Sequence, residues 1–119
     1  TGHNEAAWIY LSNQLNELVC NQLHIVFGMV DDKDIDAVIQ LLPEKAVYYF
    51  TKASCKRALS EYSIEQKAKK RGLKGTSYSS VKEACCAALS AMLNNDCLFI
   101  GGSNYIVSEV LISQPWLKK

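Results

Sequence analysis

Histidines and closely spaced cysteines are scarce in this chain, and their scarcity bears on metal sites. The 119 residues include two histidines and five cysteines, and no two cysteines stand in a Cys-x-x-Cys spacing. Structural zinc sites need four such ligands, usually in pairs at short fixed spacings. We therefore expect no zinc centre. We interpret the cysteines as small core residues of a protein in a reducing cytoplasm.

The chain also lacks a long apolar run and an excess of charge of either sign. No stretch approaches the roughly 20 apolar residues that a membrane-spanning helix requires. The formal net charge is +1, so no overall field attracts the chain to nucleic acid or to an anionic membrane. The basic run Lys67–Arg71 has no interleaved aromatic residues and is typical of a solvated helix face. We expect neither a nucleic-acid partner nor a membrane partner.

What the chain does contain is enough apolar material for one core. Hydrophobic residues make up 49% of the sequence and charged residues 21%, which are ordinary values for a globular domain. We expect residues 1–119 to form a single domain that needs no metal ion or disulfide for stability.

Helical and strand patterns alternate along the chain. Apolar residues at helical spacing predict helices, and short apolar runs predict buried strands. Ser63 and Ser80 each stand three residues before Gln or Glu, the pattern of a capping box. The expected helices cover residues 5–20, 35–42, 63–71 and 81–92, with a last one after residue 103. The expected strands cover residues 23–30, 45–51 and 97–102, with a short edge strand near 76–78.

This order predicts an α/β fold, a three-layer, Rossmann-like domain whose mostly parallel sheet is flanked by helices. A chain of this class that begins with a helix is unusual. A strand immediately before Thr1 would complete the pattern, and we expect the domain to lack this first strand here. Asn4 would then cap the first helix and also belong to the turn that leaves the missing strand.

Polar clusters follow the predicted buried strands and the missing one. Ligands of open α/β sheets bind at the carboxyl ends of the strands, so the convergence of these clusters at one edge is the main functional signal. The clusters are Gly2-His3-Asn4, Asp31-Asp32-Lys33-Asp34, Thr51-Lys52-Ala53-Ser54 and Gly101-Gly102-Ser103-Asn104.

Each cluster also has a purely structural interpretation. Asn4 can be no more than a helix cap, and the aspartates of residues 31–34 can stop a strand and favour the positive end of the next helix. Thr51-Lys52 is an ordinary strand exit. Gly102-Ser103 is either a tight turn or a place where backbone and hydroxyl approach an anion at a helix start.

The order of these motifs resembles a known family. It is similar to the C-terminal domain of folylpolyglutamate synthase and dihydrofolate synthase, which are ATP-dependent ligases related to the Mur ligases. The resemblance covers about residues 1–112 and departs from the family at Gly2, at Glu5 and at residues 55–57. The matching stretches are GHN, GMVDDKD, YYFTKASCKRAL, SSVKEACCAAL and LFIGGSNYIVSEVL.

The resemblance implies an enzyme that activates a folate or dihydropteroate carboxylate with ATP to an acyl phosphate, which the amine of L-glutamate attacks. An N-terminal P-loop domain would bind most of the ATP, Mg²⁺ and folate, and this domain would close over the cleft. His3 and Asn4 match a loop on the ATP side, and Ser103 matches a contact for glutamate. The expected rim of the cleft comprises Asp32, Lys33, Asp34, Lys52 and Gly102.

The chain itself has no Gly-x-x-x-x-Gly-Lys-Ser/Thr motif, so we expect the isolated fragment to fold without catalysing ligation. The resemblance further implies a cytoplasmic monomer. Two alternatives are a receiver-like signalling module, because Asp31-Asp32 follows a strand, and a non-catalytic nucleotide-binding domain of the same fold. The receiver alternative requires an acceptor aspartate after a later strand, and none ends the strand at 45–51.

Overall fold

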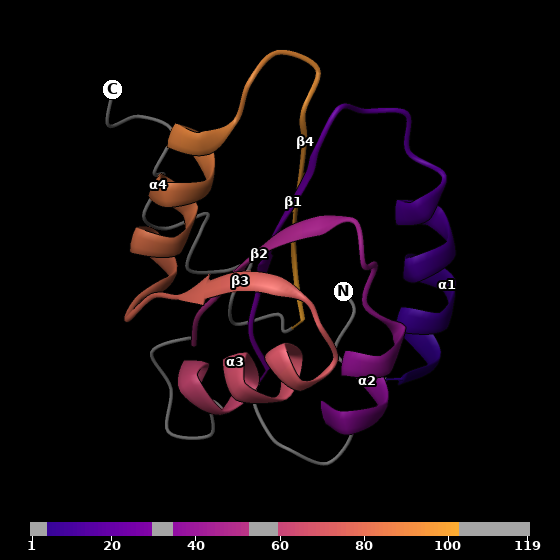
Figure 1. Cartoon of the computed structure of the whole chain (residues 1–119), viewed down its shortest axis with the longest axis vertical. Helices are drawn as coiled ribbons and strands as arrows, with labels where there is room; N and C mark the ends of the chain where they lie inside the picture. The colour runs from indigo at the N-terminus through magenta and orange to yellow at the C-terminus, as the bar shows by residue number, and fades with distance from the viewer. Residues whose placement is uncertain (1–4, 30–34, 53–59, 103–119) are drawn as a thin grey trace.

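Four parallel strands form one sheet in the computed structural model, which describes residues 5–29, 35–52 and 60–102 (Figure 1). The strand order among these residues is β3-β2-β1-β4. The predicted α/β class is confirmed. The strands are β1 (Leu23–Phe27), β2 (Ala46–Phe50), β3 (Lys74–Ser77) and β4 (Cys97–Gly101), and the helices are α1 (Glu5–Asn16), α2 (Ile35–Leu41), α3 (Glu61–Lys70) and α4 (Val81–Ala91).

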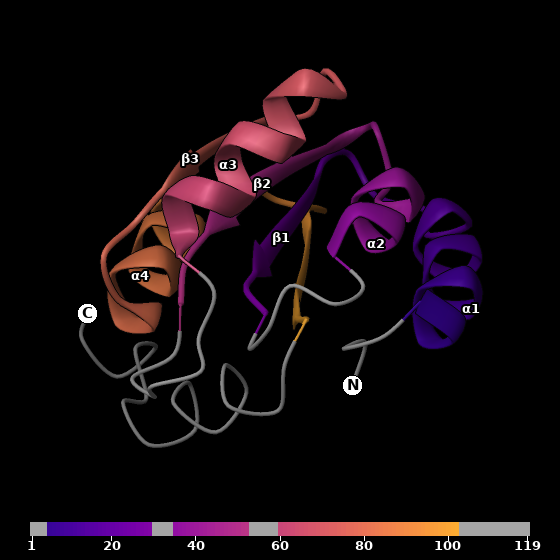
Figure 2. The same cartoon turned by 90° about the horizontal axis from the view of Figure 1, so that it is seen from below.

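The two faces of the sheet are covered by different helices. Side chains alternate between the faces of a strand, so Ile25 and Phe27 of β1 pack into the core beneath α1, α2 and α3. Val26, between them, packs with Tyr49 against α4 on the other face. Figure 2 shows α1 and α2 side by side, with α4 across the sheet from them. This arrangement gives the expected three layers.

Helix α1 is anchored by Trp8, whose side chain is completely buried. Its ring meets Phe27 and Phe99 edge-on, with centroid distances of 5.7 and 5.8 Å. The helix ends at Asn16, so the prediction that it continues to residue 20 is wrong. Leu18 and Val19, which lie within the predicted helix, are exposed. The chain must leave the helix there because the next strand begins within a few residues.

Of the two helix caps predicted at serines, the structure confirms one and contradicts the other. The Ser80 hydroxyl accepts a hydrogen bond from the Glu83 amide at 3.1 Å, which confirms the predicted start of α4. Helix α3 instead begins at Glu61, because the Ser60 hydroxyl accepts a hydrogen bond from the Tyr62 amide at 3.2 Å. Ser63 therefore lies inside the first turn of α3, and the predicted capping box at this position is wrong.

Hydrogen bonds connect the C-terminal end of α3 to the C-terminal end of α2. Arg71, the C-cap of α3, donates hydrogen bonds from Nη1 to the carbonyls of Ile39 at 2.7 Å and Leu42 at 2.6 Å. Ile39 lies in the last turn of α2 and Leu42 directly follows the helix, and the free carbonyls at a helix C-terminus favour a cation. Gly72 then turns the chain with a φ of +89° into the edge strand β3. Among the described helices, none combines the length and apolar character needed to cross a membrane.

Candidate functional site at the carboxyl edge of the sheet

The carboxyl ends of the four strands lie in one row, which we call the carboxyl edge. Three backbone hydrogen bonds beyond the strands hold this row together. The Gly28 amide donates to Gly101 at 3.3 Å, the Thr51 amide to Phe27 at 2.9 Å, and the Tyr78 amide to Phe50 at 2.8 Å. Each strand exit is thus fixed relative to its neighbour, so the residues that follow start from rigid positions.

The chain changes direction across the sheet at β1. From β1 it moves to β2 and β3 on one side, and it then crosses by way of α4 to β4 on the other side. Figure 1 shows β1 and β4 running together from the connections at the top of the picture to their carboxyl ends. Such a switch point between two strands is where open α/β sheets bind ligands, because the connections diverge and leave a crevice. The topology therefore favours the exits of β1 and β4 as the ligand-binding part of the edge.

Gly102, immediately after β4, is pressed against the exit of β1. Its φ is +102°, which side chains rarely allow, and a Cβ atom built on it would lie 2.1 Å from the Gly28 carbonyl oxygen. Only glycine permits this approach. Gly102 was predicted as a rim residue, and the structure places it at the switch point. Ser103 follows it directly in the chain.

Thr51 is a residue at this edge whose importance the sequence pattern did not indicate. Its side chain is fully buried, and within the described part of the chain its hydroxyl has no hydrogen-bond partner. A buried hydroxyl without a partner is costly, and such groups often mark a place where a ligand or water belongs. The sequence analysis places Thr51 in one of the four polar clusters, with an ordinary strand exit as the alternative, but does not include it among the predicted site residues. Its position at the end of a buried strand was the available signal.

The remaining predicted site residues divide into two groups. Lys52 follows Thr51 at the carboxyl edge and is exposed, as expected of a rim cation. The others lie outside the described residues, so their placement stays a prediction: His3, Asn4, Asp32, Lys33, Asp34 and Ser103. For two of these segments, the described residue just before the segment shows where the chain leaves the sheet. Met29 follows β1, and Gly102 follows β4 at the same switch point.

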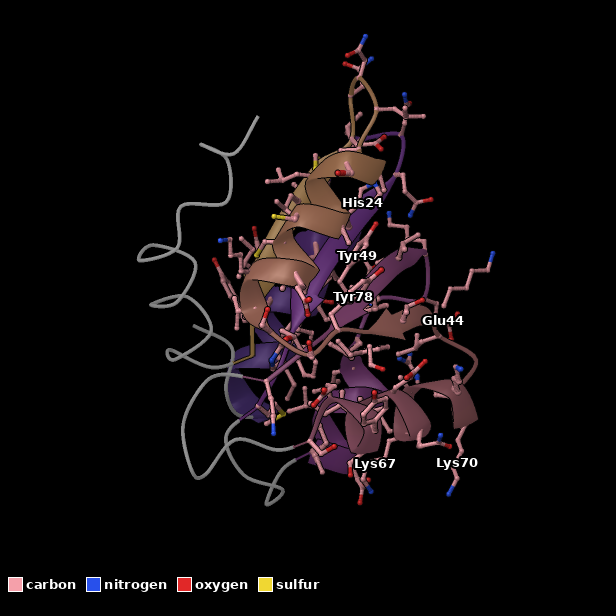
Figure 3. The ribbon with its side chains drawn as sticks, turned by 90° about the vertical axis from the view of Figure 1, so that its left-hand side faces the viewer. His24, Glu44, Tyr49, Lys67, Lys70 and Tyr78 are labelled. Carbon is pink, nitrogen blue, oxygen red and sulfur yellow. The ribbon has the colours of Figure 1, made fainter. Side chains whose placement is uncertain are left out.

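A second polar cluster lies away from this edge, under α4. The His24 ring bridges the Tyr49 hydroxyl at 2.8 Å and the Asp96 carboxylate at 2.9 Å. Figure 3 shows His24, Tyr49 and Tyr78 in succession beside α4. Burial raises the pKa of Tyr49, and the charges of Tyr78 and Asp96 add to the shift. Because His24 and Tyr49 are buried, we interpret this chain of contacts as a tie between β1, β2 and the connection before β4.

Surface hollows also lie elsewhere than the carboxyl edge. One of about 430 Å³ lies between the ends of α1 and α2 and is bordered by Lys45 and Arg71. Lys45 Nζ donates to the Asn16 carbonyl at 2.8 Å, and Arg71 is occupied by α2 carbonyls. Both cations already donate hydrogen bonds to backbone carbonyls of this chain. We therefore interpret the hollow as a groove between packed helices. Among the described residues, no three His, Cys, Asp or Glu side chains gather as a metal site.

The sequence of this chain is similar to one protein family and to two curated proteins. Residues 1–104 match the family described as "Mur ligase, glutamate ligase domain". Two similar curated proteins are both named dihydrofolate synthase/folylpolyglutamate synthase. The one from Buchnera aphidicola subsp. Schizaphis graminum is 31% identical over 111 residues, and the one from Haemophilus influenzae is 31% identical over 114 residues. These matches cover 92% and 91% of this chain but 26% of each relative, so the chain spans about a quarter of their length.

Solved structures show the same fold. E. coli FolC in complex with DHPP and ADP is similar over the whole of this chain, with a TM-score of 0.86 and 24% identity. A bifunctional folylpolyglutamate synthase/dihydrofolate synthase with Mn, AMPPNP and L-glutamate bound is similar over 96% of this chain, with a TM-score of 0.81 and 24% identity. This chain corresponds to 28% and 27% of those two chains.

Proposed function

This chain belongs to the Mur ligase glutamate ligase domain family, and from that premise we propose that it is the C-terminal domain of an ATP-dependent folylpolyglutamate or dihydrofolate synthase. The single observation that carries the proposal beyond the family is the switch point between β1 and β4, where Gly102 lies against the Gly28 carbonyl. This contact holds the exits of two strands together, and we propose that one ligand binds where they meet. The larger relatives leave room for a partner domain that holds the rest of the site.

The proposed reaction has two steps. A folate or dihydropteroate carboxylate attacks the γ-phosphate of ATP, which gives an acyl phosphate and releases ADP. The amine of L-glutamate then attacks the acyl carbon, an amide forms and phosphate leaves. An acyl phosphate is hydrolysed by water, so the enzyme must exclude solvent while it waits for the amine. A small domain with polar connections at one edge can serve as the lid.

This domain's part in the reaction is to bind, orient and shield. We assign His3 and Asn4 to the ATP side and Ser103 to the incoming glutamate. We place Asp32, Lys33, Asp34, Lys52 and Gly102 at the rim of the closed cleft. The described residues offer no metal ligand set, so we assign ATP phosphates and Mg²⁺ mainly to the N-terminal domain.

The glutamate assignment is tested by Ser103→Ala in the full-length enzyme. Loss of one hydroxyl contact to glutamate is expected to raise the KM for glutamate about tenfold, with little change in the KM for ATP. Ser90→Ala, at an exposed position of α4, is the matched control and should leave both unchanged. Equal effects of Ser103→Ala on the two KM values would rule out the glutamate assignment.

The division of labour between domains has its own test. Residues 1–119 expressed alone are expected to give a folded protein by circular dichroism but no ATP- and glutamate-dependent product. Product formed by the fragment would contradict the proposal that the N-terminal domain is needed. As part of the same proposal we place the enzyme in the cytoplasm as a monomer. Light scattering of the full-length protein would check the monomeric state.

A further inference from the structure

Two cysteines meet at the edge of the sheet opposite the carboxyl edge. Cys20 lies just before β1, and Cys97 is the first residue of β4. The backbone around them is held by hydrogen bonds between the two segments. The Cys97 amide donates to the Gln22 carbonyl at 3.0 Å, and the Asn21 amide donates to the Asn95 carbonyl at 2.9 Å. The two thiols are therefore carried by a rigid frame.

The two cysteine side chains also share their surroundings, since both border one core cluster and one surface hollow. Both side chains pack against the same core cluster, on the face that α1 covers. The pKa of the Cys97 thiol is raised, chiefly by its hydrogen bond with the Cys20 thiol and then by burial. Both residues are half-buried, and both line a surface hollow of about 450 Å³ that admits small reagents.

The other described cysteines differ from this pair. Cys85 and Cys86 are adjacent in α4 and project in different directions, and adjacent helical residues cannot reach disulfide geometry. Cys85 is buried, so a reagent in solution does not reach its thiol as it can reach Cys20 and Cys97. Cys55 lies outside the described residues. Cys20 and Cys97 are also no metal site, since the described residues bring no third ligand to them.

We propose that Cys20 and Cys97 form a redox-sensitive pair that closes to a disulfide when a small disulfide oxidant such as oxidised glutathione is present. The Cys20 thiolate attacks glutathione disulfide, which gives a mixed disulfide and releases one glutathione. The Cys97 thiolate then attacks the Cys20 sulfur and releases the second glutathione. Two protein thiols are oxidised and one glutathione disulfide is reduced to two thiols, so the exchange balances.

Closure would join the connection before β1 to the start of β4. These segments are far apart in the sequence, so a bond between them restricts the unfolded chain strongly and stabilises the folded one. The bond would lie at the amino ends of the strands, away from the switch point that carries the proposed ligand site. The inference is independent of the proposed function, because it depends only on the two thiols and their frame.

The experiment is thiol–disulfide exchange followed by peptide mapping. The protein is equilibrated in glutathione buffers of increasing oxidised fraction and quenched with acid, its free thiols are blocked with N-ethylmaleimide, and it is then digested with trypsin and Asp-N near neutral pH. Asp-N cuts before Asp96, which separates Cys97 from Cys85 and Cys86. We expect a peptide containing Cys20 linked to one containing Cys97, and an increase in Tm of about 5–15 °C that dithiothreitol reverses.

Matched variants identify the pair. Cys20→Ser and Cys97→Ser should each lose the linked peptide and the Tm increase, whereas Cys86→Ser should keep both. The crosslink is measured on the unaltered chain, so poor folding of a variant does not decide the result. Glutathione adducts that persist at either cysteine without the crosslink would overturn the proposal. So would two free thiols in a fully oxidised buffer, or linkage of Cys20 to Cys85 or Cys86.

Discussion

Replacing Gly102 by alanine tests the proposed site through a single contact. Gly102 has a φ of +102°, and its added Cβ would lie 2.1 Å from the Gly28 carbonyl oxygen and 3.0 Å from Cε1 of Phe27. Real Cβ atoms stay more than 3.0 Å from such atoms, so the exits of β1 and β4 must separate by about 1 Å. No flexible side chain end can yield instead, because the nearest atom is backbone.

The cost has two parts of known size. Holding an alanine in the left-handed region costs about 1–2 kcal/mol, and overpacking a tight contact costs about 1–3 kcal/mol. Alanine also restricts the unfolded chain, which returns about 0.5 kcal/mol. Gly102→Ala should therefore lower the free energy of unfolding by about 2–4 kcal/mol.

Two other glycines separate these contributions. Gly72 has a φ of +89° and nothing within 4 Å of its Cβ position, so Gly72→Ala isolates the backbone strain and should cost about 1 kcal/mol. Gly75 lacks the positive φ, but its Cβ would meet Phe50 at 2.6 Å and Tyr48 at 2.8 Å. Gly75→Ala therefore isolates the steric overlap, on the edge strand β3, which β2 separates from the β1 and β4 exits, and should cost about 1–3 kcal/mol.

The assay is steady-state ligation by the full-length enzyme at a temperature where all three variants are folded. A shift of about 1 Å at groups that position reactants can cost about 100-fold in rate. We expect kcat/KM of the Gly102→Ala enzyme to fall by about that factor, and those of Gly72→Ala and Gly75→Ala to stay within about twofold of the unaltered enzyme. If Gly102→Ala lost stability but kept its kcat/KM, the exits of β1 and β4 would not border the reacting groups.

Two further predictions concern stability. Trp8→Ala should lower the free energy of unfolding in urea by about 3–5 kcal/mol, because the ring is completely buried. The control Tyr10→Ala, at an exposed position of the same helix, should change it by no more than about 0.5 kcal/mol. A loss below about 1 kcal/mol for Trp8→Ala would mean that α1 is not anchored through this ring. Hydrogen bonds from the Leu93 amide and the His24 ring hold the pKa of Asp96 below its usual value. The resulting stabilisation is complete above about pH 4, the unfolded value, and is lost as pH falls through the folded pKa. Asp96→Asn should therefore flatten the decline of Tm below pH 4, and an unchanged decline would exclude this carboxylate as its source.

Much of the fold could be predicted because its signals are local. Ser80 stands three residues before a glutamate at the start of an apolar helical pattern, and both features agree with α4. Ser63 shows the same spacing, but α3 begins three residues earlier with Ser60 as its cap, although Ser60 lacks a Glu or Gln three residues later. Leu18 and Val19 continue the apolar spacing of α1, yet the bond between Asn21 and Asn95 draws the chain into β1. That bond joins residues more than 70 positions apart, and no local pattern contains it.

The contacts at the candidate site were beyond local prediction for the same reason. A Gly-Gly pair after a strand permits a close approach, but the sequence does not say which backbone is approached. That depends on β4 crossing the sheet to pair with β1, in the register Leu23 with Cys97 and Phe27 with Gly101. One pairing thus places Gly102 against Gly28 at the carboxyl end and Cys97 beside Cys20 at the amino end. A change that slips β4 by one residue would turn its core side chains to the other face, so the proposed ligand edge and the thiol pair should be lost together.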